Sequence, residues 1–286
     1  MAAKIYYAGI DLGSTITKAA IADEDGSIIV KVAGPTGAEH RRLANRVMLQ
    51  AIKEAGLTLS DIGYVVATGY GRVNVPFADC QVTELTCHAR GVSHLFPAAR
   101  TAIDIGGQDA KGLKISDGRL VDFVMNDRCA AGTGRFLEMT AATMGLKLEE
   151  LGEISLGAKG KVEISSTCTI FAQSEIVALL SEGKPLPDIL AGLHDAIAGR
   201  VVRMVSSLKV EPDVVLTGGV ALNRAVVAAI TEKLGGTVLV PDEPLFTGAS
   251  GAALLALEMS RKATSKGKDV PAKERHLAEA KLYEEA

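Results

Sequence analysis

The chain has 286 residues, 48% of them hydrophobic, and a formal net charge of −3, so it is long enough to form two globular domains. Tryptophan is absent and aromatic residues make up 4%, which argues against binding of nucleic acid by base stacking. The charge balance predicts no basic surface for nucleic acid or membrane. No apolar run has the length of a signal peptide or a membrane span, so we expect a cytoplasmic protein with reduced cysteines.

The first distinctive segment is residues 10–18, where an apolar strand runs into a tight turn and a second strand. Asp11 ends the first strand, Lys18 lies in the second, and the turn between them contains Gly13, Ser14 and Thr15. Backbone N–H groups in such a turn form a concave anion site, and a carboxylate at the strand end suits Mg2+ or its waters. The segment therefore predicts a site for a metal-bound polyphosphate. The alternative is a plain β-hairpin.

The same pattern recurs at residues 103–111, roughly 90 residues later. Asp104 and Lys111 have the spacing of Asp11 and Lys18, and the second turn contains Gly106, Gly107 and Gln108. After each copy comes a strand, an Asp-Gly turn and another strand, which is a strong hairpin signal. We therefore predict a duplicated domain whose two phosphate turns bind one nucleotide from opposite sides.

The remaining segments of the first half predict further strands and helices. We expect three strands within 5–32, a helix over 39–55, a strand over 64–67 with a Gly-rich turn at 68–72, and a helix over 83–95. Cys87 and His88 are adjacent in that last helix, so their side chains point in different directions. We favour a buried structural cysteine at position 87 over a metal ligand, and assign no role to Cys80.

The second half contains a corresponding set of elements. We expect strands over 101–105, 111–116, 120–125, 213–217 and 237–240, and helices from Thr133 to Gly145, over 170–181, over 188–208 and from 247 to about 259. Thr133 is the candidate N-cap of its helix. The small residues at 247–253 predict a helix that packs closely on another element.

Two cysteines lie in segments rich in Gly, Ser and Thr that precede helices. Cys129 and Cys168 are both expected near helix N-termini, where the helix dipole favours thiolate. Two unrelated cysteines in turns are the alternative to a metal or redox site. An iron–sulfur cluster usually needs four cysteines, so two subunits of a symmetric dimer would have to share one here.

A third ligand-type turn, Gly218-Gly219, follows the strand at 213–217. Ligands dock at the carboxyl ends of strands in open α/β sheets, so this turn could cover an adenine ring. A purely structural turn is the alternative.

The order of these motifs resembles the actin and sugar-kinase superfamily of ATPases. The resemblance includes the two phosphate turns, the adenosine turn at Gly218-Gly219, and connecting segments at 68–72 and 247–253. It implies an α/β chain with two ribonuclease-H-like (actin-like ATPase) domains and the nucleotide in the cleft between them. We expect the first domain over 1–99, completed by a C-terminal helix at 248–286, and the second, which carries both cysteines, over 100–247.

A narrower resemblance covers residues 5–258. The segments CAAGTGRFLE at 129–138, SSTCTIFAQSE at 165–175, ATGYGR at 67–72, IDIGGQD at 103–109 and VLTGGVALN at 215–223 are similar to the activators of 2-hydroxyacyl-CoA dehydratases, within the BadF/BadG/BcrA/BcrD-type ATPase family. This implies an ATPase coupled to electron transfer, a homodimer with one 4Fe–4S cluster held by Cys129 and Cys168 of both subunits, a dehydratase partner, and ferredoxin or flavodoxin as electron donor. The ATP-binding subunits of benzoyl-CoA reductase, and activators of related double-cluster reductases, have similar motifs.

The resemblance also implies roles for individual residues. Asp11 and Asp104 would hold Mg2+ through water, and the candidate catalytic residues are Asp11, Asp104, Gln108 and Glu138. The candidate ATP- and ADP-binding residues are Gly13, Ser14, Thr15, Lys18, Gly106, Gly107, Gln108, Gly132, Gly134, Glu138, Gly218, Gly219, Ala221 and Asn223.

Two other functions remain open at the level of sequence. A small-molecule kinase of the same superfamily would need a base near the γ-phosphate, for which Asp104 and Asp109 are the available side chains. A nucleotide-responsive scaffold with structural zinc at the cysteines would need no redox chemistry.

Overall fold

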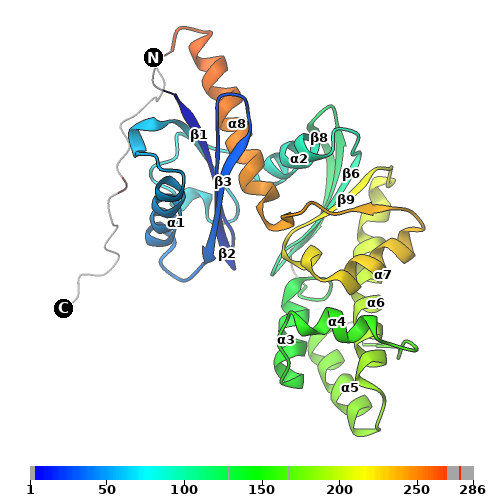
Figure 1. The fold of residues 1–286 in the computed structure, drawn as a ribbon. Coiled ribbons are helices and arrows are strands. Elements are labelled where there is room, and N and C mark those ends of the chain that lie inside the picture. Colours follow the sequence, from blue (N-terminus) through cyan, green and yellow to red (C-terminus); the bar gives the residue numbers. More distant parts are fainter. Residues whose placement is uncertain (1–3, 128, 167, 269–276, 278–286) are drawn as a thin grey trace, which may run out of the picture. The chain divides into compact units, whose positions relative to one another are not determined.

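The computed structural model describes residues 4–127, 129–166, 168–268 and 277 (Figure 1). The chain divides into two compact units. Unit 1 comprises Met1–Pro97, Asp117–Leu120 and Phe246–Ala286, and unit 2 comprises Ala98–Ser116 and Val121–Leu245. Of the C-terminal helix that we expected over 248–286, residues 269–276 and 278–286 lie outside the described residues.

Unit 1 is built on a five-stranded mixed sheet of order β3-β2-β1-β4-β5. β1 pairs antiparallel with β2 and parallel with β4. The strands are β1 (Tyr6–Leu12), β2 (Ile16–Ala22), β3 (Ile28–Pro35), β4 (Ile62–Thr68) and β5 (Cys80–Gln81), and the helices are α1 (His40–Glu54), α2 (Glu84–Leu95) and α8 (Thr247–Thr264).

Side chains along β1 point alternately to the two faces of the sheet, and each face packs against different helices. Ala8, Ile10 and Leu12 belong to the apolar cluster that contains α1, whereas Tyr7 belongs to the cluster of α2 and α8. Gly9 lies against α8 so closely that a Cβ there would overlap backbone atoms of the helix. The small residues at the start of α8 therefore permit the close packing that we predicted.

Unit 2 repeats this topology. Its strands are β6 (Thr101–Ile105), β7 (Ala110–Ser116), β8 (Arg119–Asn126), β9 (Val214–Thr217) and β10 (Val238–Leu239). Their order, β10-β9-β6-β7-β8, is that of unit 1 written in reverse, with β6 antiparallel to β7 and parallel to β9. The α/β class and the duplication are confirmed.

The helices of unit 2 are α3 (Gly134–Met144), α4 (Glu150–Leu156), α5 (Thr169–Ser181), α6 (Leu186–Val205) and α7 (Arg224–Leu234). α6 contributes Ile189, Leu193, Ile197 and Val201 to the core and lies beside α7 (Figure 1). The expected helix over 188–208 ends at Val205 and continues as a short 3-10 turn. Among the described residues, no helix is both long and apolar enough to cross a membrane.

Candidate functional site

The first phosphate turn places a buried carboxylate at the end of β1. Strand pairing puts Asp11 opposite Lys18, and Lys18 Nζ lies 2.9 Å from Asp11 Oδ2. Asp11 is 1% exposed, and its Oδ1 has no hydrogen-bond partner among the described residues. Ser14 and Thr15 are exposed in the turn. A carboxylate that is held in place and has one oxygen without a hydrogen-bond partner fits a role in holding Mg2+ or its water ligands.

The second phosphate turn has the same register but different partners. Asp104 lies opposite Lys111, whose Nζ is 3.5 Å from Asp104 Oδ2 and 2.8 Å from Asp109 Oδ1. Thr217 Oγ1 donates a 2.9 Å hydrogen bond to Asp104 Oδ1. We did not select Thr217 from the sequence, although its position at the end of β9, next to Gly218-Gly219, was a usable signal.

The two connecting segments of unit 1 both reach Asp11. A Cβ at Gly69, whose φ is +85°, would overlap Asp11 Oδ1. One at Gly248 would lie 3.3 Å from Asp11 Oδ2 and 2.8 Å from His88 Nε2. These glycines therefore let the backbone approach the carboxylate, and the glycine-rich segments contribute to the site as expected.

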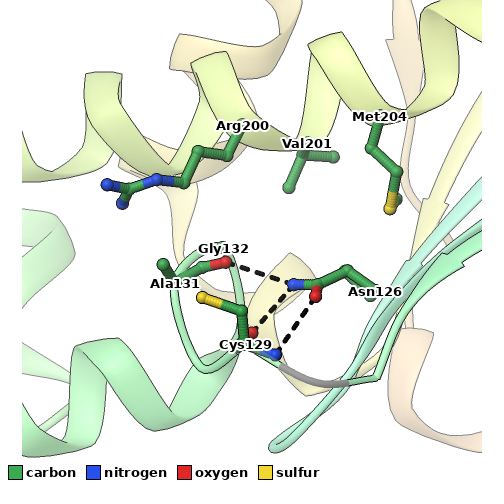
Figure 2. A pocket seen from close by; sticks show the side chains of 8 residues that line it. Asn126, Cys129, Ala131, Gly132, Arg200, Val201 and Met204 are labelled. Atoms are coloured by element: carbon green, nitrogen blue, oxygen red, sulfur yellow. Dashed lines mark hydrogen bonds between the residues drawn. The ribbon is translucent and has the colours of Figure 1, made fainter. Parts of the chain in front are cut away.

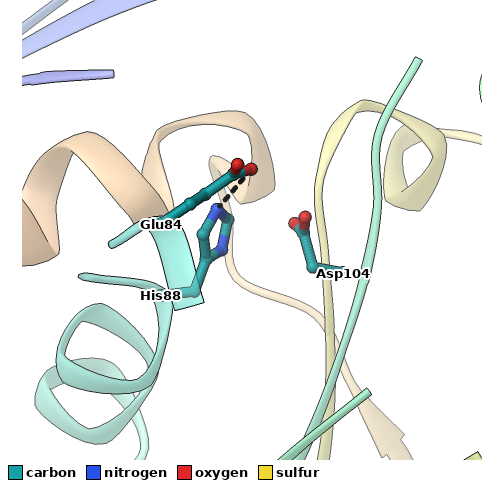
Figure 3. Close-up of side chains that lie close together, drawn as sticks. All are labelled: Glu84, His88 and Asp104. Atoms are coloured by element: carbon teal, nitrogen blue, oxygen red, sulfur yellow. Dashed lines mark ion pairs between the residues drawn. The ribbon is translucent and has the colours of Figure 1, made fainter. Parts of the chain in front are cut away.

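α2 supplies His88, which sequence reasoning left out of the site. Its Nε2 lies 3.8 Å from Glu84 Oε1, one helical turn earlier (Figure 3). The adjacent Cys87 is buried, and burial raises the pKa of its thiol to about 12. Cys87 is therefore a neutral structural cysteine, as predicted.

In unit 2 the phosphate turn is bonded directly to the start of α3. The N–H groups of Gly134 and Arg135 donate to the carbonyls of Gly106 and Gly107 at 2.9 and 2.7 Å. A Cβ at Gly134 would lie 3.1 Å from Gly106 O and 3.2 Å from Val220 Cγ2. The second phosphate turn, the α3 start and the Gly218 turn thus come together, as the sequence motifs implied.

A glycine is required at position 218 because the backbone there packs closely against the end of β6. Its φ is +86°, and a Cβ would overlap Ile105 O and lie 2.9 Å from Asp104 Oδ1. Gly219 has more space, because a Cβ there would meet only Leu245 Cδ1, at 3.9 Å. Ala221 is buried.

The remaining predicted nucleotide-binding residues differ in exposure and in whether their side chains already have polar partners. Gln108 is exposed, and Glu138 forms a 3.1 Å ion pair with Arg135. Asn223 is the N-cap of α7: its Oδ1 accepts from Ala225 N and Val226 N at 3.0 and 3.2 Å. Its amide nitrogen bonds His194, so its side chain is engaged within unit 2.

Cys129 is exposed in a loop that Asn126 holds in place (Figure 2). Asn126 Nδ2 donates to Cys129 O at 2.8 Å and to Ala131 O at 3.3 Å, and Cys129 N donates to Asn126 Oδ1 at 3.2 Å. The loop borders a pocket of about 320 Å³, whose other side is formed by Arg200, Val201 and Met204 of α6. Gly132 belongs to this cysteine loop, with φ +91°, and packs on α6.

Cys168 is also exposed, and its turn is held by Glu175. Ser165 N and Ser166 N donate to the two carboxylate oxygens at 2.9 Å, and Ser165 Oγ donates at 2.8 Å. Burial raises the pKa of Glu175, but these hydrogen bonds outweigh it and hold the pKa at about 2. Asn126 and Glu175 therefore hold the two cysteine turns, and we selected neither residue from the sequence.

The two cysteines lie at different distances from the helices that follow them. Cys168 is the N-cap residue of α5. Cys129 lies five residues before α3 begins, and the first N–H groups of α3 bond to the phosphate turn. Thr133 is the N-cap residue of α3, but its hydroxyl donates to Ala130 O at 2.8 Å and does not cap the helix.

Arg200 relates the two cysteines to each other. Burial and the charge of Arg203 lower the pKa of its guanidinium, and negative charge at Cys129 and Cys168 opposes that shift. Both sulfur atoms therefore lie within electrostatic reach of one cation. Two exposed thiols in one region fit half of the four-cysteine set that an iron–sulfur cluster needs.

Comparison with known proteins identifies the family of the chain. Residues 8–256 match the model of the BadF/BadG/BcrA/BcrD ATPase family. The 2-hydroxyisocaproyl-CoA dehydratase activator of Clostridioides difficile is 44% identical over 269 residues, which cover 93% of this chain and 100% of the relative. A more distant relative, one of the subunits of benzoyl-CoA reductase from Thauera aromatica, is 32% identical over 259 residues, covering 86% of this chain and 91% of the relative.

A solved structure has the same fold over nearly the whole chain. The activator of 2-hydroxyisocaproyl-CoA dehydratase from Clostridium difficile, solved with bound ADPNP, matches with a TM-score of 0.87 and 44% identity, covering 94% of this chain and 100% of the other. The actin-like ATPase fold that we expected is thereby confirmed. The chain belongs to the BadF/BadG/BcrA/BcrD ATPase family.

Proposed function

We propose that this protein is an ATP-hydrolysing iron–sulfur activator that delivers a low-potential electron to a 2-hydroxyacyl-CoA dehydratase. The observation that carries the proposal is the pair of exposed cysteines, Cys129 and Cys168, near one guanidinium in a unit whose phosphate turn is bonded to the helix after Cys129. The name of the 44% identical relative supports the choice of partner.

MgATP is bound by the strand-end carboxylates and the glycine turns. Asp11, through Oδ1, and Asp104 would hold Mg2+ through its waters, and the hydrated ion would supply positive charge to the phosphates and water for hydrolysis. Lys18 neutralises Asp11 from 2.9 Å. The phosphates and nucleoside contact the remaining candidates, which are Gly13, Ser14, Thr15, Gly106, Gly107, Gln108, Gly132, Gly134, Glu138, Gly218, Gly219, Ala221 and Asn223.

The cysteines hold the redox group. Cys129 Sγ and Cys168 Sγ of two copies of the chain would together supply four thiolate ligands to one 4Fe–4S cluster. When bound, such a cluster supplies one-electron transfer. Ferredoxin or flavodoxin is the proposed donor, and the dehydratase the acceptor.

The hydrogen bonds between the second phosphate turn and α3 link the nucleotide site to the loop of Cys129. A change in the position of Gly106 and Gly107 on loss of the γ-phosphate moves the N–H groups of Gly134 and Arg135, which donate to the carbonyls of that turn. The loop of Cys129 immediately precedes this helix. Switching a two-state element from 1:99 to 99:1 requires about 5.5 kcal/mol of differential binding, which nucleotide contacts at several turns can supply.

Anaerobic purification tests the proposal. We expect a brown dimer with about four iron and four sulfide per two chains. Cys129→Ser and Cys168→Ser should each lose the cluster and keep ATP binding, whereas Cys80→Ser, the matched control, should keep both. A colourless or zinc-containing protein, or retention of the cluster by both serine variants, contradicts the proposal.

The second candidate is an ATP-binding component or activator of benzoyl-CoA reductase, which the relative from Thauera aromatica favours at lower identity. The two candidates differ in the partner that accepts the electron. Purified, cluster-loaded protein with ATP should activate a 2-hydroxyacyl-CoA dehydratase and leave the catalytic component of benzoyl-CoA reductase inactive. Phosphorylation of a small acceptor by iron-free protein would instead indicate a kinase.

A further inference from the structure

Arg200 connects the two cysteine-bearing segments of unit 2. It projects from α6 beside the loop of Cys129 (Figure 2). Its Nη2 donates a 2.8 Å hydrogen bond to the carbonyl of Ser166, two residues before Cys168. Its guanidinium carbon lies 5.9 Å from the ring centroid of Phe136, in the helix that follows Cys129. The Arg200 side chain therefore contacts a residue near each of the two cysteines in the sequence.

The guanidinium also has an unused donor. Arg200 Nη1 is buried and has no hydrogen-bond partner among the described residues. A buried N–H without an acceptor is costly, and a guanidinium cannot relieve the cost by losing its proton. The charges that act on this cation include those of Cys129 and Cys168, on the two segments that Arg200 contacts. A sulfur atom of a cluster held by these cysteines would supply an acceptor.

We propose that Arg200 is a positioning residue for the iron–sulfur cluster, and that its Nη1 donates a hydrogen bond to a cluster or cysteinate sulfur and raises the reduction potential. This inference rests on the proposed function. Net charge and hydrogen bonds to sulfur are two of the properties that determine the potential of such clusters. A partly desolvated cation acts on a nearby negative group with little screening by water.

A purely structural role for Arg200 predicts different behaviour. If Arg200 only anchored the turn at Ser166, its replacement would change iron occupancy or thermal stability and leave the potential of the bound cluster unchanged. The Arg200→Lys variant separates the effect of charge from the effect of hydrogen bonding. Lysine keeps the positive charge but lacks the planar group that can bond Ser166 and a sulfur atom at once.

The test uses anaerobically purified, cluster-loaded full-length protein. Arg200→Gln, Arg200→Lys and Arg203→Gln are compared with the original by iron content, thermal stability and midpoint potential from an EPR-monitored redox titration. Arg203→Gln is the charge control, because Arg203 is an exposed arginine on the same helix whose charge acts on Arg200. We expect a more negative potential for Arg200→Gln and smaller negative shifts for Arg200→Lys and Arg203→Gln.

Each outcome has a definite meaning. A loaded Arg200→Gln protein with the original potential, or a shift no larger than that of Arg203→Gln, overturns the inference. If Arg200→Gln does not retain iron, the Arg200→Lys variant decides by the same criterion, and an unchanged potential there overturns the inference. An iron-free protein with all of its arginines intact overturns the proposed function itself, which distinguishes the two failures.

Discussion

At the scale of single residues, the two strand-end aspartates are not equivalent. Both oxygens of Asp104 have partners, in Thr217 and Lys111, whereas Asp11 offers an oxygen with no partner among the described residues. Lys18 holds the other oxygen of Asp11 and fixes the direction of the carboxylate. Asp11 is therefore the better candidate for a direct role in holding the hydrated Mg2+.

We predict that Asp11→Asn weakens Mg2+ binding in the nucleotide complex by about 10–100-fold, the range observed when an oxygen that orients a metal site is lost. The substitution keeps the shape of the side chain but removes its charge. The measurement is ATP hydrolysis as a function of Mg2+ concentration. Asp25→Asn, in the exposed Asp-Gly turn of unit 1, is the control. An unchanged Mg2+ requirement in the Asp11 variant would show that this carboxylate does not serve the metal.

The cysteines should differ in reactivity. Burial raises the pKa of the Cys87 thiol to about 12, so at neutral pH it is both shielded and protonated. Cys129 and Cys168 are exposed. We predict that iodoacetamide labels Cys129 and Cys168 of native, iron-free protein before Cys87, as measured by peptide mass spectrometry. Unfolded protein, in which all cysteines should react, is the control, and equal labelling of Cys87 in native protein would contradict its structural role.

At the scale of elements, α2 and α8 of unit 1 pack through glycines. A Cβ at Gly251 would overlap the carbonyl of Cys87, and one at Gly91 would overlap the carbonyl of Thr247. Because both obstacles are backbone atoms, neither helix can relieve the overlap by a change of rotamer. The contact matters for function, since α2 carries His88 and α8 begins beside Asp11.

We predict that Gly251→Ala lowers the free energy of unfolding of unit 1 by about 1–3 kcal/mol, the usual cost of overpacking. Gly236→Ala is the matched control, because no heavy atom lies within 4 Å of the added Cβ and its φ is not in the left-handed region. Urea unfolding measures both. Equal stability of the two variants would show that the helices move apart without cost.

At the scale of the whole molecule, the two units share one topology and one register. In each, the first strand pairs antiparallel with the second and parallel with the fourth, and an aspartate on the first strand lies opposite a lysine on the second. Only unit 2 has been extended between its third and fourth strands by the segment with both cysteines and helices α3 to α6. Both cysteines of the proposed cluster site therefore lie in an additional segment of one of two repeated units.

Global stability should depend on pH through His194. Burial lowers the pKa of this residue to about 4, and its ring nitrogens bond Ser155 Oγ at 2.9 Å and Asn223 Nδ2 at 3.1 Å. In the unfolded chain the pKa returns to about 6.5. The unfolded state thus binds more protons between these values, so the contribution of His194 is complete above about pH 6.5 and declines as the pH falls towards 4.

We predict that a decrease in pH from 7.5 to 5 lowers the free energy of unfolding of unit 2 by about 2 kcal/mol, because the unfolded state takes up a proton at His194. Urea unfolding at the two pH values measures the change. His194→Gln should show a smaller decrease over the same interval, whatever its stability at pH 7.5. The same decrease in both proteins would assign the pH dependence to other groups.

The sequence by itself determined the features that depend on neighbouring residues. The strand–turn–strand units, the pairing of Asp11 with Lys18 and of Asp104 with Lys111, and the ends of most helices follow from alternation, turn residues and hydrogen bonding within a few positions. Motif order also indicated the fold. Helices α4 and α7 were not predicted, because α4 has only seven residues and Asn223, the N-cap of α7, was interpreted as part of the adenosine turn.

Only the tertiary structure decided which groups meet. His88 and Asp11 both lie close to Gly248 because α2 packs on α8. The start of α3 bonds to Gly106 and Gly107 because the core of unit 2 brings these distant segments together. Arg200 lies near both cysteines because α6 passes beside both of their turns. Contacts between residues far apart along the chain depend on how helices pack against the sheets, and no local pattern encodes them.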